Sequence, residues 1–418
     1  MSKNRRVLVT GGAAGIGWAI CRALAARGYR IALADIDAAA ARAGVKELGD
    51  GHVALSVDLT DRASALALPQ LAAEALGGLD VIVNNAGMTD TSGKSLTELP
   101  VSSFDRLIAL NLSAVEAICS AAPRVLRPGS TIVNLASGAA WRPLALRGPY
   151  SATKAGIVAL TETLAKEYAS RGIAVSAIAP GYTLTPLVQS LADEGLVDLE
   201  KVAAGVPLGR IALPEDIAAA VVFSASQEGR VLSGETLGVD GLGLFGPAPQ
   251  GAAPAAGIAG SGRLAILSPP DGLELDGAGG MVALPDPAGI AAAGPLNALI
   301  DFTALAPETG APQVLSRIRE VAIRAARAER RHDFSLLFVF GPGKSAESSA
   351  AVAAGGMLAK TLALEWAPSG IRVNALEWHG TKLPDLLTVC RFLVGEGAAM
   401  ITGQVVRAGL AKTWDGAA

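Results

Sequence analysis

The sequence has few cysteines, few aromatic residues and few charges. Its three cysteines, Cys21, Cys119 and Cys390, stand singly among 418 residues, so they supply neither a disulfide framework nor the spacing of a metal site. We therefore expect a reducing, cytoplasmic location. Charged residues make up 17% of the chain and the formal net charge is −3, which argues against nucleic acid as a partner.

Long apolar runs are also missing. No charge-free run of about 18 strongly apolar residues occurs, so no membrane-spanning helix is predicted. The basic start of the chain runs through Val7-Leu8-Val9 into a glycine-rich turn, which leaves too short an apolar stretch for a signal peptide. These absences predict a soluble protein that acts on small molecules.

The sequence does contain a regular alternation of short apolar runs with helical segments. The runs predicted as strands are residues 7–10, 29–34, 53–57, 79–83 and 130–135. Such alternation is typical of a doubly wound, parallel α/β sheet of the Rossmann type. Ligands of these sheets bind outside the carboxyl ends of the strands, where the polar motifs of this sequence also fall.

A glycine-rich turn joins the first predicted strand to a predicted helix, residues 18–27. The turn reads Gly11-Gly12-Ala13-Ala14-Gly15-Ile16-Gly17. Glycines let the backbone approach a pyrophosphate, and the free N–H groups of the helix start face it together with the helix dipole. An ordinary tight turn is the alternative, but the order of strand, turn and helix favours dinucleotide binding.

The second predicted strand leads to Asp35, about 20 residues after the glycines. A carboxylate there accepts hydrogen bonds from the ribose hydroxyls and repels a 2′-phosphate, and no arginine follows in Ile36-Asp37. We therefore predict NAD as the cofactor, in preference to NADP. Alternatively, Asp35 is a solvated loop acid or a helix cap.

A tyrosine and a lysine lie four residues apart at Tyr150 and Lys154, after a predicted strand that leads to Ser137. On a helix this spacing places both side chains on one face. A cation near a phenol lowers the phenol's pKa, and such a phenol can transfer a proton in carbonyl and alcohol chemistry. A solvated helix face is the alternative for the tyrosine–lysine spacing alone.

Asn111 lies in a predicted helix, residues 104–122. An asparagine buried in a helix is costly unless its amide has partners. It is therefore either a bend that holds a water molecule or an ordinary exposed polar residue.

Taken together, these motifs resemble those of the classical short-chain dehydrogenase/reductase family. They are T-G-x-x-x-G-x-G at residues 10–17, N-N-A-G at 84–87, Ser137, Y-x-x-x-K at Tyr150 and Lys154, and Pro180-Gly181. They occur in the family's order, and the resemblance covers residues 5–245. It implies an oxidoreductase that interconverts a secondary alcohol and a ketone.

The resemblance also implies a role for each motif residue. Tyr150 would be the general acid and base, Ser137 would hydrogen-bond the reacting oxygen, and Lys154 would lower the tyrosine pKa and hold the nicotinamide ribose. Asn111 would anchor a water relay to Lys154. The implied cofactor-binding residues are Gly11, Ala14, Gly15, Ile16, Gly17, Asp35, Ile36, Asp58, Leu59, Asn85, Ala86, Gly87, Tyr150, Lys154, Pro180, Gly181, Thr183 and Thr185.

The substrate is less clearly indicated. The candidates for contact with it are Ala139, Arg142, Arg147 and Tyr182. An arginine between Ser137 and Tyr150 could hold an anionic substrate, or both arginines could be ordinary surface residues. Residues 186–213 are predicted to form a lid. Two other functions remain possible: a non-catalytic binding or scaffold protein, and a dehydratase or epimerase of the same family that uses bound NAD.

The second half of the chain repeats part of the first. T-L-A-K-E-Y-A-S-R-G-I at residues 163–173 is echoed by T-L-A-L-E-W-A-P-S-G-I at 361–371, an offset of 198 positions. Leu232-Ser233-Gly234 is echoed by Ile401-Thr402-Gly403, an offset of 169. The difference of 29 residues corresponds to the lid. We therefore predict tandem Rossmann-like domains, a catalytic one at 1–246, a linker at 247–261 and a shortened, degenerate one at 262–418.

The second copy keeps predicted helices at 312–331 and 350–367 and a closing strand at 403–407, but the chemistry is missing from it. Ser348 and Val352 stand where Tyr150 and Lys154 stand in the first, and Ser268-Pro269-Pro270-Asp271-Gly272 replaces the glycine turn. Prolines remove N–H donors that a pyrophosphate would use, so this domain is expected to bind no cofactor. We predict that it replaces a partner subunit, so that a homodimer forms a pseudo-tetramer of four such domains. No metal site is expected.

Overall fold

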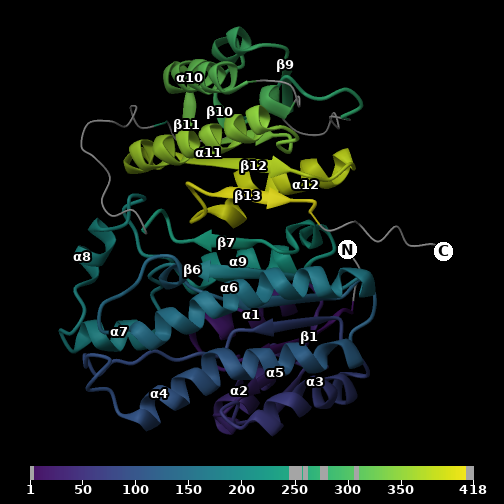
Figure 1. Ribbon diagram of the computed structural model, residues 1–418, viewed down its shortest axis with the longest axis vertical. Coiled ribbons are helices and arrows are strands. Elements are labelled where there is room, and N and C mark those ends of the chain that lie inside the picture. The colour runs from purple at the N-terminus through teal and green to yellow at the C-terminus, as the bar shows by residue number, and fades with distance from the viewer. Residues whose placement is uncertain (1–3, 244–256, 258–261, 274–280, 306–309, 411–418) are drawn as a thin grey trace. The chain divides into compact units, whose positions relative to one another are not determined.

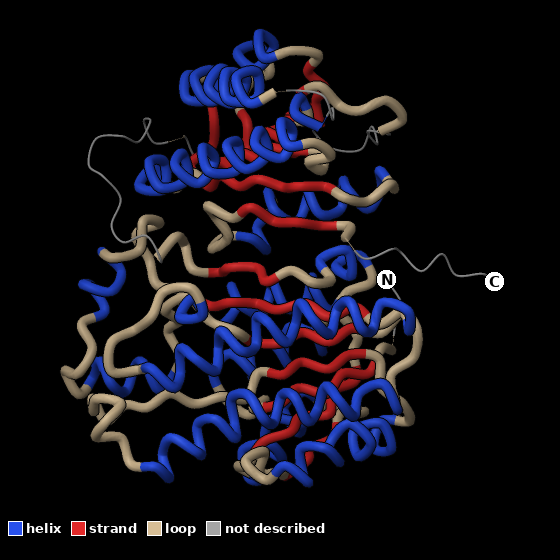
Figure 2. Tube along the Cα trace, viewed as in Figure 1, coloured by secondary structure: helices blue, strands red, loops and turns tan. Residues whose placement is uncertain are grey.

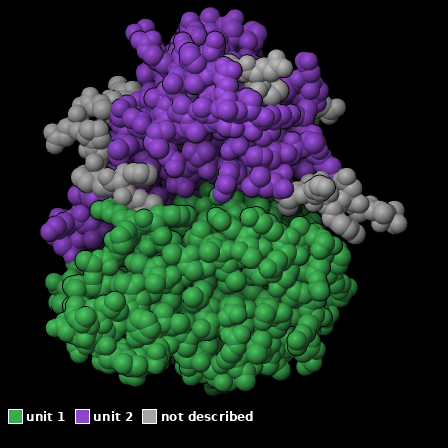
Figure 3. Space-filling model, in the orientation of Figure 1, with its two compact units in different colours: residues 1–197, 212–238, 411–418 green, residues 198–211, 239–410 purple. Residues whose placement is uncertain are grey.

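The computed structural model describes residues 4–243, 257, 262–273, 281–305 and 310–410. The chain forms two compact units, shown in different colours in Figure 3. Of the described residues, the first unit holds 4–197 and 212–238, and the second holds 198–211 and 239–410. Apart from Gly257, the predicted linker lies outside the described residues. No helix in the described part of the chain is long and apolar enough to cross a membrane.

The first unit contains a seven-stranded sheet in the order β3-β2-β1-β4-β5-β6-β7 (Figure 1). Its strands are β1 (Arg6–Thr10), β2 (Arg30–Asp35), β3 (Val53–Ser56), β4 (Val81–Asn84), β5 (Thr131–Leu135), β6 (Ala174–Pro180) and β7 (Thr236–Val239). The pairings from β3 through β6 are parallel. The predicted parallel α/β sheet is therefore confirmed, and the five predicted strands match β1 to β5 within two residues at each end.

Helices pack on both faces of this sheet. They are α1 (Gly15–Ala25), α2 (Ala38–Leu48), α3 (Arg62–Leu76), α4 (Val101–Ile108), α5 (Ala114–Ala121), α6 (Gly148–Tyr168), α7 (Pro186–Asp193) and α9 (Pro214–Ala225). On one side α3 packs against α5, and on the other α1 packs against α9. Consecutive residues Val7, Leu8 and Val9 of β1 are all 0% exposed, because a strand covered on both faces buries every side chain.

The predicted helix 104–122 is interrupted by a turn of π-helix. Helix α4 ends at Ile108, the π-turn η1 spans Ala109–Ser113, and α5 starts at Ala114. Asn111 lies in the middle of this turn and is only 1% exposed. Single π-turns inside α-helices are frequent at functional sites. The alternative that Asn111 is an ordinary exposed residue is therefore wrong, and the bend that holds a water molecule stays a prediction.

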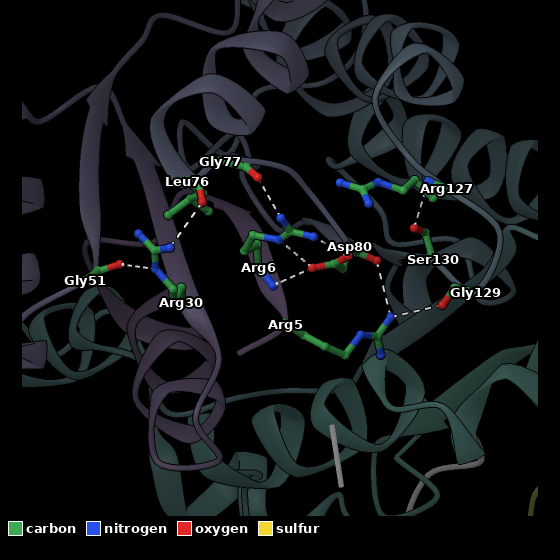
Figure 4. A network of polar contacts seen from close by, with 10 residues as sticks. All are labelled: Arg5, Arg6, Arg30, Gly51, Leu76, Gly77, Asp80, Arg127, Gly129 and Ser130. Carbon is green, nitrogen blue, oxygen red and sulfur yellow. Dashed lines mark hydrogen bonds and ion pairs between the residues drawn. The ribbon is translucent and has the colours of Figure 1, made fainter. Parts of the chain in front are cut away.

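Arg5 and Arg6 connect neighbouring segments at the amino-terminal edge of the sheet by hydrogen bonds (Figure 4). Buried Arg5 donates to the carbonyl oxygens of Ala225, Asp80 and Gly129 at 2.7, 3.3 and 3.1 Å. Arg6 forms a two-pronged ion pair with Asp80, with N–O distances of 2.8 and 3.0 Å. Although burial opposes ionisation, these hydrogen bonds hold the pKa of Asp80 below its usual value. This edge serves stability, and the motif residues lie at the opposite edge.

The second unit contains a six-stranded sheet in the order β13-β12-β11-β10-β8-β9, with every adjacent pair parallel (Figure 2). The strands are β8 (Arg263–Leu267), β9 (Met281–Leu284), β10 (Leu296–Asp301), β11 (Arg330–Phe340), β12 (Arg372–Trp378) and β13 (Val405–Ala408). The helices are α8 (Leu199–Ala204), α10 (Ala311–Arg327), α11 (Ala346–Trp366) and α12 (Leu383–Val394). This order of strands matches that of the first sheet without its outermost strand β3.

The sequence located the elements of the second unit less accurately. The predicted helix 312–331 ends at Arg327, because Ala328 is extended and β11 begins at Arg330. The predicted helix 350–367 starts earlier, at Ala346, because the side chain of Ser345 caps it. Ser348, at the position that corresponds to Tyr150, belongs to this cap: its hydroxyl oxygen accepts the N–H groups of Lys344 and Ser345 at 2.9 Å.

Candidate active site

The glycine-rich turn is built so that only glycine fits at its key positions. Gly11 and Gly15 have φ angles of 61° and 53°, in the left-handed region. A Cβ on Gly17 would lie 1.9 Å from the carbonyl oxygen of Gly11, which is a backbone atom that cannot move aside. The cap residue of α1, Ala14, offers no side-chain acceptor. The first N–H groups of α1 are therefore well suited to an anion.

Thr10 locks this turn to the N-N-A-G segment after β4. Its Oγ1 accepts the backbone N–H groups of Asn85 and Ala86, both at 3.0 Å. In return, Nδ2 of Asn85 donates to the carbonyl oxygens of Thr10 and Gly11 at 3.0 Å. The motifs of the sequence alone do not indicate this role of Thr10. Its place at the end of β1, before the first glycine, was the available signal.

Asp35 ends β2 and lies beside the glycine turn. Its Oδ2 accepts the N–H of Ala13 at 3.0 Å, and its Oδ1 accepts the N–H of Asp37 at 3.1 Å. The cap of α2 is Asp37, whose side chain accepts the N–H groups of Ala39 and Ala40, so Asp35 is not a helix cap. The adjacent Ile36 is 61% exposed. This carboxylate is held at the edge of the turn, as a ribose-binding role requires.

Of the two implied cofactor-binding residues after β3, Asp58 lies at the surface and Leu59 in the core. Asp58 is exposed, and its Oδ1 accepts the N–H and the hydroxyl of Thr60 at 2.9 and 2.7 Å. These bonds lower the pKa of Asp58. The side chain of Leu59 is 6% exposed and packs in the core. A cofactor contact of Leu59 would therefore come from its backbone.

Ser137, Tyr150 and Lys154 come together at the carboxyl end of β5. Ser137 follows β5 and hydrogen-bonds with the Tyr150 side chain, while its Oγ accepts the N–H of Ala139 at 3.2 Å. On α6, the Lys154 Nζ lies 5.7 Å from the centre of the Tyr150 ring. The same Nζ donates to the carbonyl oxygen of Leu135 at 2.8 Å. The predicted helix geometry of Y-x-x-x-K is therefore present, and the solvated-face alternative is wrong for Lys154, which is 5% exposed.

The tyrosine–lysine spacing predicted a lowered pKa for Tyr150, but in the structure this pKa is raised. Burial raises the pKa of the Tyr150 phenol, and the hydrogen bond from Ser137 and the charge of Arg147 only partly oppose it. Burial also lowers the pKa of Lys154 to about 8. Desolvation disfavours the charged form of each group. In the protein alone, it therefore outweighs the lowering of the tyrosine pKa that the lysine was predicted to give.

Asn111 connects the loop after β4 to helix α6. Its Oδ1 accepts the N–H of Met88 and its Nδ2 donates to the carbonyl oxygen of Met88, both at 2.8 Å. Nδ2 also lies 3.4 Å from Oγ1 of Thr153. A Cβ on Gly87 would lie 3.4 Å from the Asn111 Oδ1 and 3.6 Å from the Lys154 Nζ. Asn111 and Lys154 therefore share one small space, but the water relay stays a prediction.

The segment after β6 reaches back to the glycine turn. Pro180 ends β6, and Oγ1 of Thr183 donates to the carbonyl oxygen of Gly181 at 3.2 Å. Thr185 caps α7, where its Oγ1 accepts the N–H of Val188 at 3.3 Å. A Cβ on Gly15 would lie 3.6 Å from the Thr185 Cβ. The structure thus places Thr185 beside the turn, as expected for a segment that closes over a dinucleotide.

The four candidate substrate residues differ in their surroundings. Ala139 is buried at 7% exposure, Tyr182 is 45% exposed and Arg142 is exposed. Arg147 is engaged with the loop after β4: its Nη1 donates to Oγ1 of Thr89 at 2.8 Å and to the carbonyl oxygen of Asp90 at 3.0 Å. The guanidinium of Arg147 therefore already has two polar partners.

The predicted lid contains α7 in the first unit and α8 in the second. Two hydrogen bonds connect the residues at the two ends of this segment. The N–H of Leu184 donates to the carbonyl oxygen of Ala212 at 2.8 Å, and the N–H of Ala212 donates to the carbonyl oxygen of Tyr182 at 3.1 Å. Within the described residues, no group of three or more His, Cys, Asp or Glu side chains is placed to hold a metal ion.

Comparison with known proteins identifies relatives of the first unit. Residues 11–243 match the family model described as enoyl-(acyl carrier protein) reductase. An uncharacterized short-chain type dehydrogenase/reductase of Sinorhizobium fredii is 37% identical over 250 residues, 60% of this chain but only 45% of that protein. D-threitol dehydrogenase of Mycolicibacterium smegmatis is 38% identical over 56% of this chain and 90% of its own. Cis-4-hydroxycyclohexanecarboxylate dehydrogenase of Sinomonas cyclohexanicum is 41% identical over 57% and 96%.

Solved structures agree with the sequence relatives. A 3-ketoacyl-(acyl-carrier-protein) reductase of Brucella melitensis complexed with NADH is similar at 28% identity and a TM-score of 0.53, over 58% of this chain and 99% of that one. A short chain dehydrogenase of Burkholderia cenocepacia in complex with NADP is 34% identical at a TM-score of 0.53, over 57% and 97%. The family model covers more than half of the 418 residues, and with the site geometry it shows that this chain belongs to the short-chain dehydrogenase/reductase family.

Proposed function

We propose that this protein interconverts a secondary alcohol and a ketone with NAD as its cofactor. The observation that carries the proposal is the cluster of Ser137, Tyr150 and Lys154 at the carboxyl end of β5, in which Lys154 is buried and Ser137 and Tyr150 are partly exposed. A hydroxyl, a phenol and an ammonium held together in this way form a proton-transfer site. Relatives that are named as dehydrogenases of D-threitol and of a hydroxycyclohexanecarboxylate support an alcohol as the substrate.

The residues of the glycine turn fit a dinucleotide. The absence of a Cβ at Gly11 and Gly17 lets the turn pack closely against Ala86 and against its own backbone, and the uncapped start of α1 supplies N–H donors for a pyrophosphate. Asp35 would hold the adenosine ribose, and its negative charge supports NAD over NADP. Ile36, Asp58 and Leu59 would line the adenine side. NAD, when bound, supplies the acceptor or donor of the hydride.

The side chains of the cluster would divide the proton chemistry. The hydroxyl of Ser137 orients the reacting oxygen by a hydrogen bond. Tyr150 gives or takes the proton at its phenolic oxygen. Lys154, fixed by the Leu135 carbonyl, holds a positive charge beneath the phenol when protonated. Asn111 fixes the loop at Met88 so that Gly87 can lie against the Lys154 ammonium.

We expect NADH formation from a polar secondary alcohol, and we expect its rate to rise with pH. Burial raises the pKa of Tyr150, so the phenolate that accepts the alcohol proton is scarce near neutral pH and becomes more abundant as the pH increases. Ketone reduction uses the protonated phenol and should not show this rise. The measurement is the NADH absorbance with a panel of polyols, cyclic hydroxycarboxylates, hydroxy acids and apolar alcohols, each with NAD and with NADP.

The panel also separates the substrate classes. Turnover confined to carboxylates supports an anion-binding role for Arg142, and Arg142→Ala should then raise KM with little change in kcat. Turnover of neutral polyols alone would leave Arg142 without that role. Turnover with NADP but not with NAD would contradict the assignment of Asp35, and no turnover with any alcohol would contradict the function itself.

For the second unit we propose a structural role as a degenerate short-chain dehydrogenase domain that binds no cofactor. The matching winding of its sheet supports this proposal, as does the helix cap that Ser348 forms in place of a catalytic phenol. We further propose that the unit takes the place of a partner subunit, so that two chains assemble as a homodimer. A fully active species with the light-scattering mass of one chain would contradict this assembly.

A further inference from the structure

Arg147 stands at the start of the catalytic helix and reaches a different loop. It precedes α6, three residues before Tyr150, and its Nη1 contacts Thr89 Oγ1 and the Asp90 carbonyl oxygen at 2.8 and 3.0 Å. The preceding Leu146 has a φ of 62°, a left-handed conformation that is costly for a branched residue without a structural reason. The backbone is therefore turned sharply just before this arginine.

The same loop holds the first turn of α6 a second time, through Asn111. Both backbone polar groups of Met88 bond to Asn111, whose Nδ2 lies 3.4 Å from Oγ1 of Thr153. The Thr153 hydroxyl donates to the carbonyl oxygen of Tyr150 at 2.8 Å. Together with the contacts of Arg147, these bonds close a ring from α6 to the loop and back to α6. Tyr150 lies in the chain between Arg147 and Thr153, the two residues through which the loop is attached.

We propose that Arg147 is a positioning residue for proton transfer, held by the loop after β4 so that its guanidinium stabilises the Tyr150 phenolate. The inference rests on the function proposed above for Tyr150. The charged groups on the elements around the phenol are Lys154, Glu162, Lys166 and Glu167 on α6, Arg142 and Arg147 before α6, and Asp90, Lys94 and Glu98 on the loop after β4. Arg147 is the residue that caps α6, and Tyr150 is the third residue of that helix, a spacing at which side chains are neighbours. In agreement with this placement, the charge of Arg147 lowers the pKa of Tyr150. A second cation thus assists the tyrosine–lysine pair.

The test is a spectroscopic titration of Tyr150, which needs neither substrate nor cofactor. The chain has four tyrosines, so the ultraviolet difference between each protein and its Tyr150→Phe counterpart isolates one phenol. Arg147→Gln should move the Tyr150 titration to higher pH by roughly half to one pH unit, because a cation that favours the phenolate is lost. Arg147→Lys keeps the charge and should titrate close to the unmodified protein. Arg127→Gln, an exposed arginine elsewhere, is the control for loss of charge.

A second variant tests the contacts of Arg147 with the loop after β4 without removing the charge. Thr89→Val deletes one acceptor of Arg147 and should shift the titration in the same direction by a smaller amount. If alcohol oxidation is observed, Arg147→Gln should also lower kcat by about 10-fold near neutral pH and recover as the pH rises. An unshifted titration in Arg147→Gln would overturn the proposal. A rise in KM for anionic substrates alone, with kcat unchanged, would also overturn it, because Arg147 would then bind substrate.

Discussion

Replacing Tyr150 with phenylalanine is expected to abolish NADH formation while leaving cofactor binding intact. In the proposed mechanism the phenol is the acid–base group, and the phenylalanine ring can neither give nor take a proton. We expect kcat to fall by about 10³-fold or more, since nothing else at the site replaces a positioned acid–base group. Steady-state rates give kcat, and fluorescence titration with NADH gives the dissociation constant.

The controls for this variant are chosen within the first unit. Tyr29→Phe removes a phenol that directly precedes β2 and lies at the amino-terminal edge of the sheet, so it should leave kcat unchanged. Retention of more than about one tenth of the activity by Tyr150→Phe would assign proton transfer to another group. Loss of NADH binding in Tyr150→Phe would show that the side chain supports the cofactor site as well, and the kinetic effect alone could then not be assigned to proton transfer.

The second large effect is expected from Gly17→Ala. The added Cβ would lie 1.9 Å from the carbonyl oxygen of Gly11 and also meet Nδ2 of Asn85 at 2.6 Å, so the turn must open. That movement also breaks the bonds by which Asn85 holds Thr10 and Gly11. We expect NADH to bind roughly 100-fold more weakly, about 3 kcal/mol, and the melting temperature to fall.

Gly44→Ala is the matched control for this variant. Gly44 also lies in a helix, α2, but an added Cβ would meet the tip of the Trp18 side chain at 3.0 Å, and not a backbone atom. It should therefore keep NADH affinity near the original value. Gly17→Ala with unchanged affinity would mean that the turn does not carry the pyrophosphate, and the dinucleotide assignment would be wrong.

Much of the first unit could be predicted from the sequence because its signals are local. Apolar runs that end in turn residues mark strands buried on both faces, and β1 to β5 followed that rule closely. The ordered motifs then placed Ser137, Tyr150 and Lys154 at one edge, because carboxyl ends of parallel strands share an edge. The strength of the prediction came from the agreement of several motifs in one order.

What could not be predicted depends on contacts between distant segments. The π-turn at Asn111 arises from bonds to Met88, a residue 23 positions away, and no local pattern in a helical sequence marks it. The net direction of the Tyr150 pKa depends on burial, which the sequence does not give. The partners of Arg147, Thr89 and Asp90, also could not be found from the sequence, because they lie 58 and 57 positions away. This is why Arg147 was interpreted as a candidate substrate-binding residue.

The second unit was harder to predict for a related reason. Its order of strands follows that of the first unit. However, its sequence marks the ends of helices and strands less clearly. In α10 the alternation of arginines with apolar residues continues past Arg327 into β11, so composition alone did not mark the end of the helix. The change of backbone at Ala328, where φ is −70° and ψ is 155°, sets the boundary.

Isotope transfer is the most direct test of the central claim, that this site moves a hydride between an alcohol and NAD. The best alcohol from the panel, carrying deuterium on its carbinol carbon, is incubated with NAD, and the reduced cofactor is analysed by mass spectrometry. We predict that the NADH formed carries the deuterium and that the Tyr150→Phe protein forms none. Product that appears without labelled NADH would contradict the account and would indicate a dehydratase or an epimerase.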